Sequence, residues 1–144
     1  MKISTKGRYG IRLIADLAMN SCGEAISLKE ISARQNISVK YLEQIVRQLC
    51  NAQLLRSSRG AQGGYKLTRS PQDYTIGDIL RAIEGNLAPV ACLEDEPNQC
   101  PSYNQCTTIK MWEGLYKAIT DYLDGITIQG FVDQHLESNG NYII

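Results

Sequence analysis

The chain has 144 residues, of which 43% are hydrophobic and 21% are charged. These values are typical of a globular chain with one sizeable core, and they exclude a disordered or fibrous protein. The sequence has no apolar run of about eighteen residues and no secretory signal, so it predicts a cytoplasmic protein without a membrane partner.

The net charge is zero, but the basic and acidic residues are unevenly distributed along the chain. Residues 1–70 hold 12 Lys and Arg against 4 Asp and Glu, a net charge of +8, whereas residues 71–144 hold 3 against 11, a net charge of −8. A basic half joined to an acidic half is typical of a chain in which only one part faces nucleic acid. The alternative is two solvated faces that segregate by chance.

A first helix is predicted from Tyr9 to Asn20, because its apolar residues recur at three- and four-residue spacings. Residues 21–23 end it with a glycine. Lys2 and Arg8 lie just ahead of this helix, where they can contact DNA phosphates.

A helix-turn-helix is predicted between residues 27 and 51. Ser27 and Glu30 have the spacing of a capping box, in which each side chain satisfies a free backbone N–H at a helix start. A polar turn over residues 35–37 leads to a second N-cap at Ser38. The helix that follows buries one apolar face and leaves polar residues outside, as a recognition helix must.

A two-stranded wing is predicted after that helix. Residues 54–58 and 65–68 read as strands, and the six residues from Arg59 to Gly64 include three glycines. Glycine permits the positive φ angles of a hairpin tip. An arginine on a thin loop can enter a narrow minor groove, where the negative potential is enhanced.

These elements together predict one DNA surface, with the recognition helix in the major groove and the wing in the minor groove. Glu43 is expected to set selectivity more than affinity, because a carboxylate accepts from cytosine but repels phosphates. The alternative is a helix and hairpin that pack without any ligand. The predicted DNA-contacting residues are Lys2, Arg8, Ser38, Lys40, Tyr41, Glu43, Gln44, Arg47, Arg59, Gly60, Gln62, Gly63, Gly64 and Tyr65.

The sequence predicts that the chain is organised in three parts. A turn at residues 70–73 and a helix between Thr75 and Gly85 complete a DNA-binding domain over residues 1–85. Asp78 and Glu84 on that helix are interpreted as a solvated face. No nucleophile, base or pocket signature accompanies them, which favours a protein that is not an enzyme.

Residues 86–108 predict an irregular, cysteine-bearing loop, and residues 109–144 a dimerisation helix with a C-terminal tail. The long helix is amphipathic and its apolar side needs a surface to cover. A second copy of the chain would supply one and would place two recognition helices across a two-fold axis, matching a pseudo-palindromic operator. The alternative is that the helix folds back on its own domain. Residues 127–134 are predicted to form a further short helix, followed by a polar tail from Ser138.

The loop holds Cys92, Cys100 and Cys106 in a Cys-x7-Cys-x5-Cys pattern. A structural disulfide is not expected in a reducing cytoplasm, and thiolates are soft ligands suited to iron-sulfur clusters and zinc. Simple thiol sensing, or three unconnected cysteines, would give the same pattern. Cys22 and Cys50 are interpreted as ordinary small, partly buried residues.

Three ordered motifs carry a resemblance to a known family: residues 7–10 (GRYG), residues 41–44 (YLEQ) and residues 59–65 (RGAQGGY). In this combination the chain resembles the Rrf (type two) family of bacterial winged-helix transcription regulators. The resemblance covers nearly the whole chain and implies a mainly α winged helix-turn-helix with a two-stranded wing and a long C-terminal dimerisation helix.

Within that family, the loop resembles the members that carry an iron-sulfur cluster, typified by the iron-sulfur cluster regulator IscR. The resemblance implies that Cys92, Cys100 and Cys106 hold the cluster, favouring a 2Fe-2S over a 4Fe-4S type. The first two cysteines are separated by seven residues where those members have five, and Ile109 stands where they have a histidine ligand, so the fourth ligand stays open. His135, the only histidine, is interpreted as a surface residue.

The function predicted is a homodimeric DNA-binding transcription regulator that senses iron-sulfur status, redox or nitric oxide through its cluster. The alternative is a cluster-free regulator of cysteine or sulfur metabolism that acts through a protein partner or thiol oxidation, since residues 93–96 resemble that branch of the family. A cluster-bearing enzyme or electron carrier is a third alternative, but the chain shows no nucleotide-binding loop or second redox site.

Overall fold

A computed structural model describes residues 1–140; residues 141–144, the end of the predicted tail, lie outside the described part. The fold is mainly helical with one two-stranded antiparallel sheet, as predicted. The helices are α1 (Thr5–Asn20), α2 (Leu28–Gln35), α3 (Val39–Asn51), α4 (Ile76–Glu84), α5 (Ile109–Asp124) and α6 (Ile128–Gly140), and the strands are β1 (Leu55–Ser58) and β2 (Gly64–Leu67). The short 3-10 turns are η1 (Pro71–Asp73), η2 (Ala91–Leu93) and η3 (Tyr103–Gln105).

The helix-turn-helix follows the local signals of the sequence. Ser27 and Glu30 form the predicted capping box at the start of α2, and Asn36 takes the left-handed conformation that ends this helix. Ser38 then caps α3, whose bounds are the predicted ones. The buried residues of α3 are Leu42, Ile45, Val46 and Leu49.

Helix α1 begins four residues earlier than predicted, so Arg8 lies inside its first turns and not ahead of it. The Ser4 hydroxyl caps this start by accepting from Gly7 N at 3.0 Å. Ser4 itself is fixed by Glu84, whose Oε1 accepts from the Ser4 backbone N at 2.8 Å and from its hydroxyl at 2.6 Å. The interpretation of Glu84 and Asp78 as a solvated face is therefore wrong. Asp78 likewise completes a capping box with Thr75 at the start of α4.

The GRYG motif of residues 7–10 allows α1 to pack closely on α4. A Cβ on Gly10 would overlap Cδ1 of Ile83, and one on Gly7 would overlap the Glu84 carboxylate. The two glycines therefore let the helices approach more closely than any side chain would permit. Tyr9, between them, packs partly buried against the core.

The wing pairs Leu55 with Leu67 at its base and Ser58 with Gly64 near its tip. A third segment, absent from the prediction, joins it: Ile26 N donates to the Tyr65 carbonyl at 3.1 Å, and Tyr65 N donates to the Ile26 carbonyl at 2.9 Å. This bridge ties the wing to the segment before α2. The wing is thus anchored to the helix-turn-helix on both sides.

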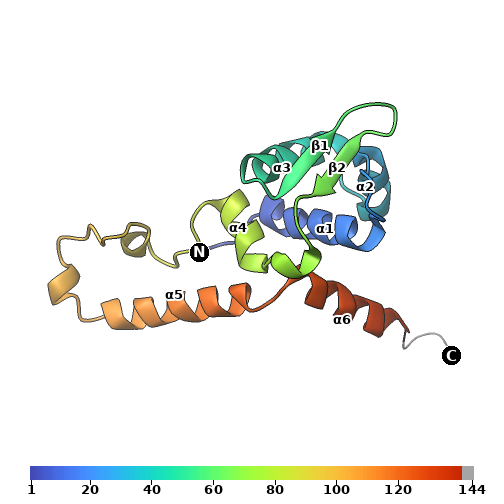
Figure 1. Cartoon of the computed structure of the whole chain (residues 1–144). Coiled ribbons are helices and arrows are strands. Elements are labelled where there is room, and N and C mark those ends of the chain that lie inside the picture. The colour runs from blue at the N-terminus through green and yellow to red at the C-terminus, as the bar shows by residue number, and fades with distance from the viewer. Residues whose placement is uncertain (141–144) are drawn as a thin grey trace.

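Helices α5 and α6 differ in their relation to the rest of the chain (Figure 1). Helix α6 is longer than predicted and lies against α1, where Ile128 and Val132 are buried in the core shared by α1 to α4. Helix α5 extends to one side of that body with the cysteine loop beside it, and Ile109 is its only buried residue. Thr108 precedes it without forming a side-chain cap hydrogen bond. None of the helices within residues 1–140 combines the length and apolar character that crossing a membrane requires.

Candidate nucleic-acid interface and cysteine loop

The recognition helix α3 presents a fixed polar face. Lys40, Glu43, Gln44 and Arg47 are exposed, while the opposite face of the helix lies in the core. Ser38 accepts from the backbone N of Tyr41 at 3.2 Å, which fixes the first turn of the helix. Because the buried face sets the rotation of α3, its exposed donors and acceptors are positioned before any ligand arrives.

Tyr41 differs from its polar neighbours on α3. Its ring is half-buried and meets the ring of Tyr9 edge to face, with centroids 5.7 Å apart and an interplanar angle of 84°. Arg12 lies over the other tyrosine, with its guanidinium carbon 5.1 Å from the Tyr9 ring centre. Tyr41 therefore joins the start of the recognition helix to α1, whatever its hydroxyl contacts.

The wing tip is built for a close approach. Arg59, Gly60 and Gln62 are exposed, and Gly60 has a φ of +113°, which favours glycine. Gly63 N donates to the Gly60 carbonyl at 2.9 Å and closes the turn. A Cβ on Gly64 would overlap the backbone of Ile26, so the RGAQGGY motif also preserves the bridge to α2.

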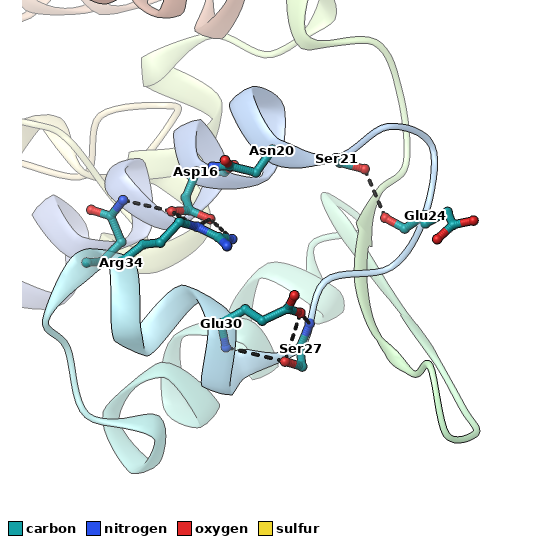
Figure 2. Close-up of polar contacts among 8 residues, drawn as sticks. Asp16, Asn20, Ser21, Glu24, Ser27, Glu30 and Arg34 are labelled. Atoms are coloured by element: carbon teal, nitrogen blue, oxygen red, sulfur yellow. Dashed lines mark hydrogen bonds and ion pairs between the residues drawn. The ribbon is translucent and has the colours of Figure 1, made fainter.

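Sequence reasoning missed a buried polar cluster that joins α1 to the end of α2 (Figure 2). The carboxylate of Asp16, which is 0% exposed, accepts from the Arg34 guanidinium at 2.7 and 3.0 Å and from the Gln35 amide at 2.8 Å. This hydrogen bonding raises the pKa of Arg34. An acidic residue within the apolar face of a predicted helix, between Ala15 and Leu17, was the signal for a buried pair.

The N-terminal segment lies against the start of the cysteine loop. Lys2 is exposed beside Ile3, and together with Glu84 and Glu94 they line a hollow of about 310 Å³. Glu84 thus accepts a hydrogen bond from Ser4 at the start of α1 and also lines the hollow next to the loop. Arg8, further along, is exposed on α1 and donates to the Thr5 hydroxyl at 3.0 Å.

The three loop cysteines are free thiols, each partly exposed. Asn98 bridges the first two, because its Nδ2 donates to the Cys92 carbonyl and its Oδ1 accepts from Cys100 N at 2.8 Å. Cys106 Sγ lies 3.5 Å from the Thr108 hydroxyl. Within residues 1–140, no three His, Cys, Asp or Glu side chains are gathered as a metal ion would require. The thiols suit an iron-sulfur cluster by donor type, and the loop would have to close for them to converge.

Neither Ile109 nor His135 is placed to act as the fourth ligand. Ile109 is 7% exposed and packs in the interior, so it leaves no donor at the position where the resemblance implies histidine. His135 lies on α6, where it lines a small hollow with Arg12 and Gln35 and contacts Asn139 at 2.9 Å. It is therefore on the α1 side of the molecule and not at the loop.

In metal-free protein, the thiol of Cys106 is expected to be more reactive than that of Cys50. Hydrogen bonds from the Thr108 hydroxyl and backbone lower the pKa of Cys106, whereas burial raises the pKa of Cys50. Because the thiolate is the nucleophile, alkylation of Cys106 by iodoacetamide should rise at a lower pH than that of Cys50. Peptide mass spectrometry after timed alkylation, at pH values from about 6.5 to 9.5, follows both cysteines in one sample. Equal pH profiles would contradict the assignment.

Comparison with known proteins gives the same family at several levels. A sequence model of the Rrf2 family, described as iron-dependent transcriptional regulator, matches residues 3–134. The chain is 41% identical over 128 residues to the protein called rrf2 of Nitratidesulfovibrio vulgaris, covering 89% of this chain and 85% of the other. It is 43% identical over 129 residues to the HTH-type transcriptional regulator CymR of Bacillus subtilis, covering 90% and 88%.

Solved structures from two branches match it equally. The structure of CymR, titled the global cysteine regulator of B. subtilis, superimposes with a TM-score of 0.76 at 40% identity, covering 93% of this chain and 98% of the other. The structure titled T. potens IscR also gives a TM-score of 0.76, at 38% identity, covering 96% and 90%. Overall similarity therefore does not separate the two branches, and the loop residues have to.

Proposed function

The chain belongs to the Rrf2 family of transcriptional regulators, and from that premise we propose that it is a homodimeric regulator that reads a pseudo-palindromic operator and receives its signal through an iron-sulfur cluster held by Cys92, Cys100 and Cys106. Its site of action would be the cytoplasm, where the DNA is. No catalytic step is part of this role.

The preset polar face of α3 carries the DNA-binding part of the proposal. Its exposed residues include long donors, Lys40 and Arg47, next to an amide and a carboxylate, which is the mixture that reads base edges. The wing stands beside it with an arginine at the tip. Incubating the dimer with a pool of randomised duplexes should enrich an inverted repeat, and enrichment of no sequence would remove the proposal.

Arg59→Ala is expected to weaken binding to the enriched operator by about 1 to 3 kcal/mol, because a specific groove contact of one arginine has that magnitude. The exposed position of Arg59 at the wing tip makes a folding defect an improbable cause. Fluorescence anisotropy with a labelled operator measures the change. Lys110→Ala is the control. Lys110 lies on α5 with its side chain 87% exposed, and the variant should bind DNA as the wild type does. Unchanged affinity of Arg59→Ala would take the wing tip out of the interface.

The loop carries the sensing part of the proposal. A cluster bound there would supply a redox-active and nitric-oxide-reactive group, and 2Fe-2S is the expected type. The chain's own contribution is positional: the Asn98 side chain links the backbone of Cys92 to that of Cys100, and Tyr103 donates to the Glu113 carboxylate on α5 at 2.7 Å. Movement of the loop would therefore reach the helix proposed to form the dimer.

Protein purified without oxygen tests this part directly. The expected result is visible charge-transfer absorption with matching iron and acid-labile sulfide, and the iron content per dimer would separate a two-iron from a four-iron site. Cys100→Ser should lose iron and sulfide, whereas Cys22→Ser, at an exposed cysteine outside the loop, should retain both. A colourless wild-type protein that still binds DNA would refute the cluster and leave the DNA function standing.

A cluster-free regulator is the second candidate, and two observations favour it. The three thiols are not gathered in the described structure, and the chain is 43% identical to CymR of B. subtilis. In that case thiol oxidation, or a protein partner, would deliver the signal. The colourless outcome above, followed by loss of operator binding on peroxide treatment of the wild type but not of Cys106→Ser, would establish the thiol form of this alternative.

A further inference from the structure

The two faces of the wing have different chemistry. In the hairpin register Ser57 lies opposite Tyr65, and Arg56 lies opposite Lys66. Successive residues of a strand point to opposite faces. Ser57 and Tyr65 line a hollow shared with α3, whereas Arg56 and Lys66 line a separate hollow of about 300 Å³ with Arg69, next to the end of α1.

The second face is lined by three cations. Among the ion pairs and side-chain hydrogen bonds of residues 1–140, none involves Arg56 or Lys66. Like charges directly opposite one another in a hairpin are destabilising, so an anion from outside would offset their repulsion. Arg69 is held as a third cation, with its guanidinium carbon 4.9 Å from the Tyr74 ring centre and a hydrogen bond to the Asp73 carbonyl at 3.3 Å.

We propose that Arg56, Lys66 and Arg69 form a phosphate-binding face that contacts the DNA strand on the far side of the minor groove from α3. This rests on the proposed DNA function and extends its footprint outward. A minor groove is about 6 Å wide and has a phosphate chain along each rim. A wing that places its tip arginine in that groove therefore has one rim on each of its faces.

The spacing along the hairpin agrees with a rim contact. Arg56 lies three residues before Arg59, roughly 10 Å along a strand that rises about 3.4 Å per residue. When Arg59 reaches into the groove, Arg56 and Lys66 stand back from the tip, and their long side chains can reach the rim. The surface is open, with Arg56 and Lys66 side by side on the hairpin and Arg69 two residues beyond the end of β2, and such an open group of cations suits a run of phosphates better than one enclosed small anion.

The test compares the wild-type dimer with Arg56→Gln/Lys66→Gln on the operator recovered by selection, placed in two unrelated flanking sequences. Each neutralised phosphate contributes about 0.9 to the slope of log affinity against log salt, so removing four cations per dimer should lower the slope by about 3 to 4. The loss should be the same in both flanks, because phosphates carry no sequence. Lys110→Gln/Lys117→Gln makes the same change in net charge on α5 and should leave the slope unchanged.

A shortened duplex provides the second arm. Trimming the operator so that the outer strand ends at the wing should lower the wild-type slope to that of the double variant and leave the variant unaffected. The thermal unfolding midpoint of the variant should equal or exceed the wild-type value, since a like-charge pair is removed. A lower midpoint would indicate a structural role and overturn the proposal.

The remaining outcomes separate this proposal from the function on which it rests. Wild-type protein that binds no duplex would remove the proposed function itself. Operator binding with the same salt slope in wild type and double variant would overturn only the phosphate face. If inorganic phosphate raises the unfolding midpoint of the wild type alone while the slopes stay equal, the face binds a small anion and the DNA contact is refuted.

Discussion

Leu115→Asp is expected to raise the dissociation constant of the proposed dimer by about a thousandfold or more. Met111, Leu115 and Tyr122 lie on one side of α5 and are 56%, 42% and 69% exposed, a stripe without cover in the single chain. A partner helix would bury it. Each dimer would then bury two unpaired carboxylates, and an unpaired charge in an interface costs about 2 to 5 kcal/mol.

Sedimentation velocity over a range of protein concentrations measures this change. Lys117→Gln alters the net charge by the same amount, but Lys117 points to the other side of α5, where it pairs with Asp121, so this control should remain dimeric. The Leu115→Asp monomer should still bind a half-site weakly through α3 and lose its preference for the inverted repeat. If the Leu115→Asp variant is still a dimer at a concentration of about 1 μM, the dimer interface lies elsewhere.

The features predicted correctly from the sequence are those that depend on near neighbours. The capping box at Ser27 joins residues three apart, the start of α4 at Thr75 follows a residue type that favours helix caps, and the bounds of α3 follow from its own apolar spacing. The start of α1 was predicted incorrectly because Ser4 is fixed by Glu84, a residue 80 positions away. No local pattern carries information of that kind.

The same reasoning accounts for the site. The exposed face of α3 was predictable because burial of one face of a helix decides the other. Pairing of Asp16 with Arg34 was not, since two charges 18 residues apart give no periodic signal. Residues 86–108 were predicted only as an irregular loop, because the spacing of Cys92, Cys100 and Cys106 does not determine where the short turns η2 and η3 fall.

Arg34→Ala is expected to lower the free energy of unfolding by about 3 kcal/mol, a large share of the roughly 5 to 15 kcal/mol available to a domain. The Asp16 side chain is 1% exposed, so its carboxylate would stay buried with only Gln35 to donate to it. Removing one partner of a buried ion pair costs about 3 to 5 kcal/mol. The lower value applies because Arg34 is 36% exposed and its removal admits water.

Urea unfolding followed by circular dichroism measures the loss, and Lys29→Ala, an exposed cation on the same helix, should change stability by less than about 0.5 kcal/mol. The variant Asp16→Ala/Arg34→Ala should be more stable than Arg34→Ala alone, because it buries no charge. If instead the single variant unfolds like the wild type, the carboxylate is not dependent on Arg34.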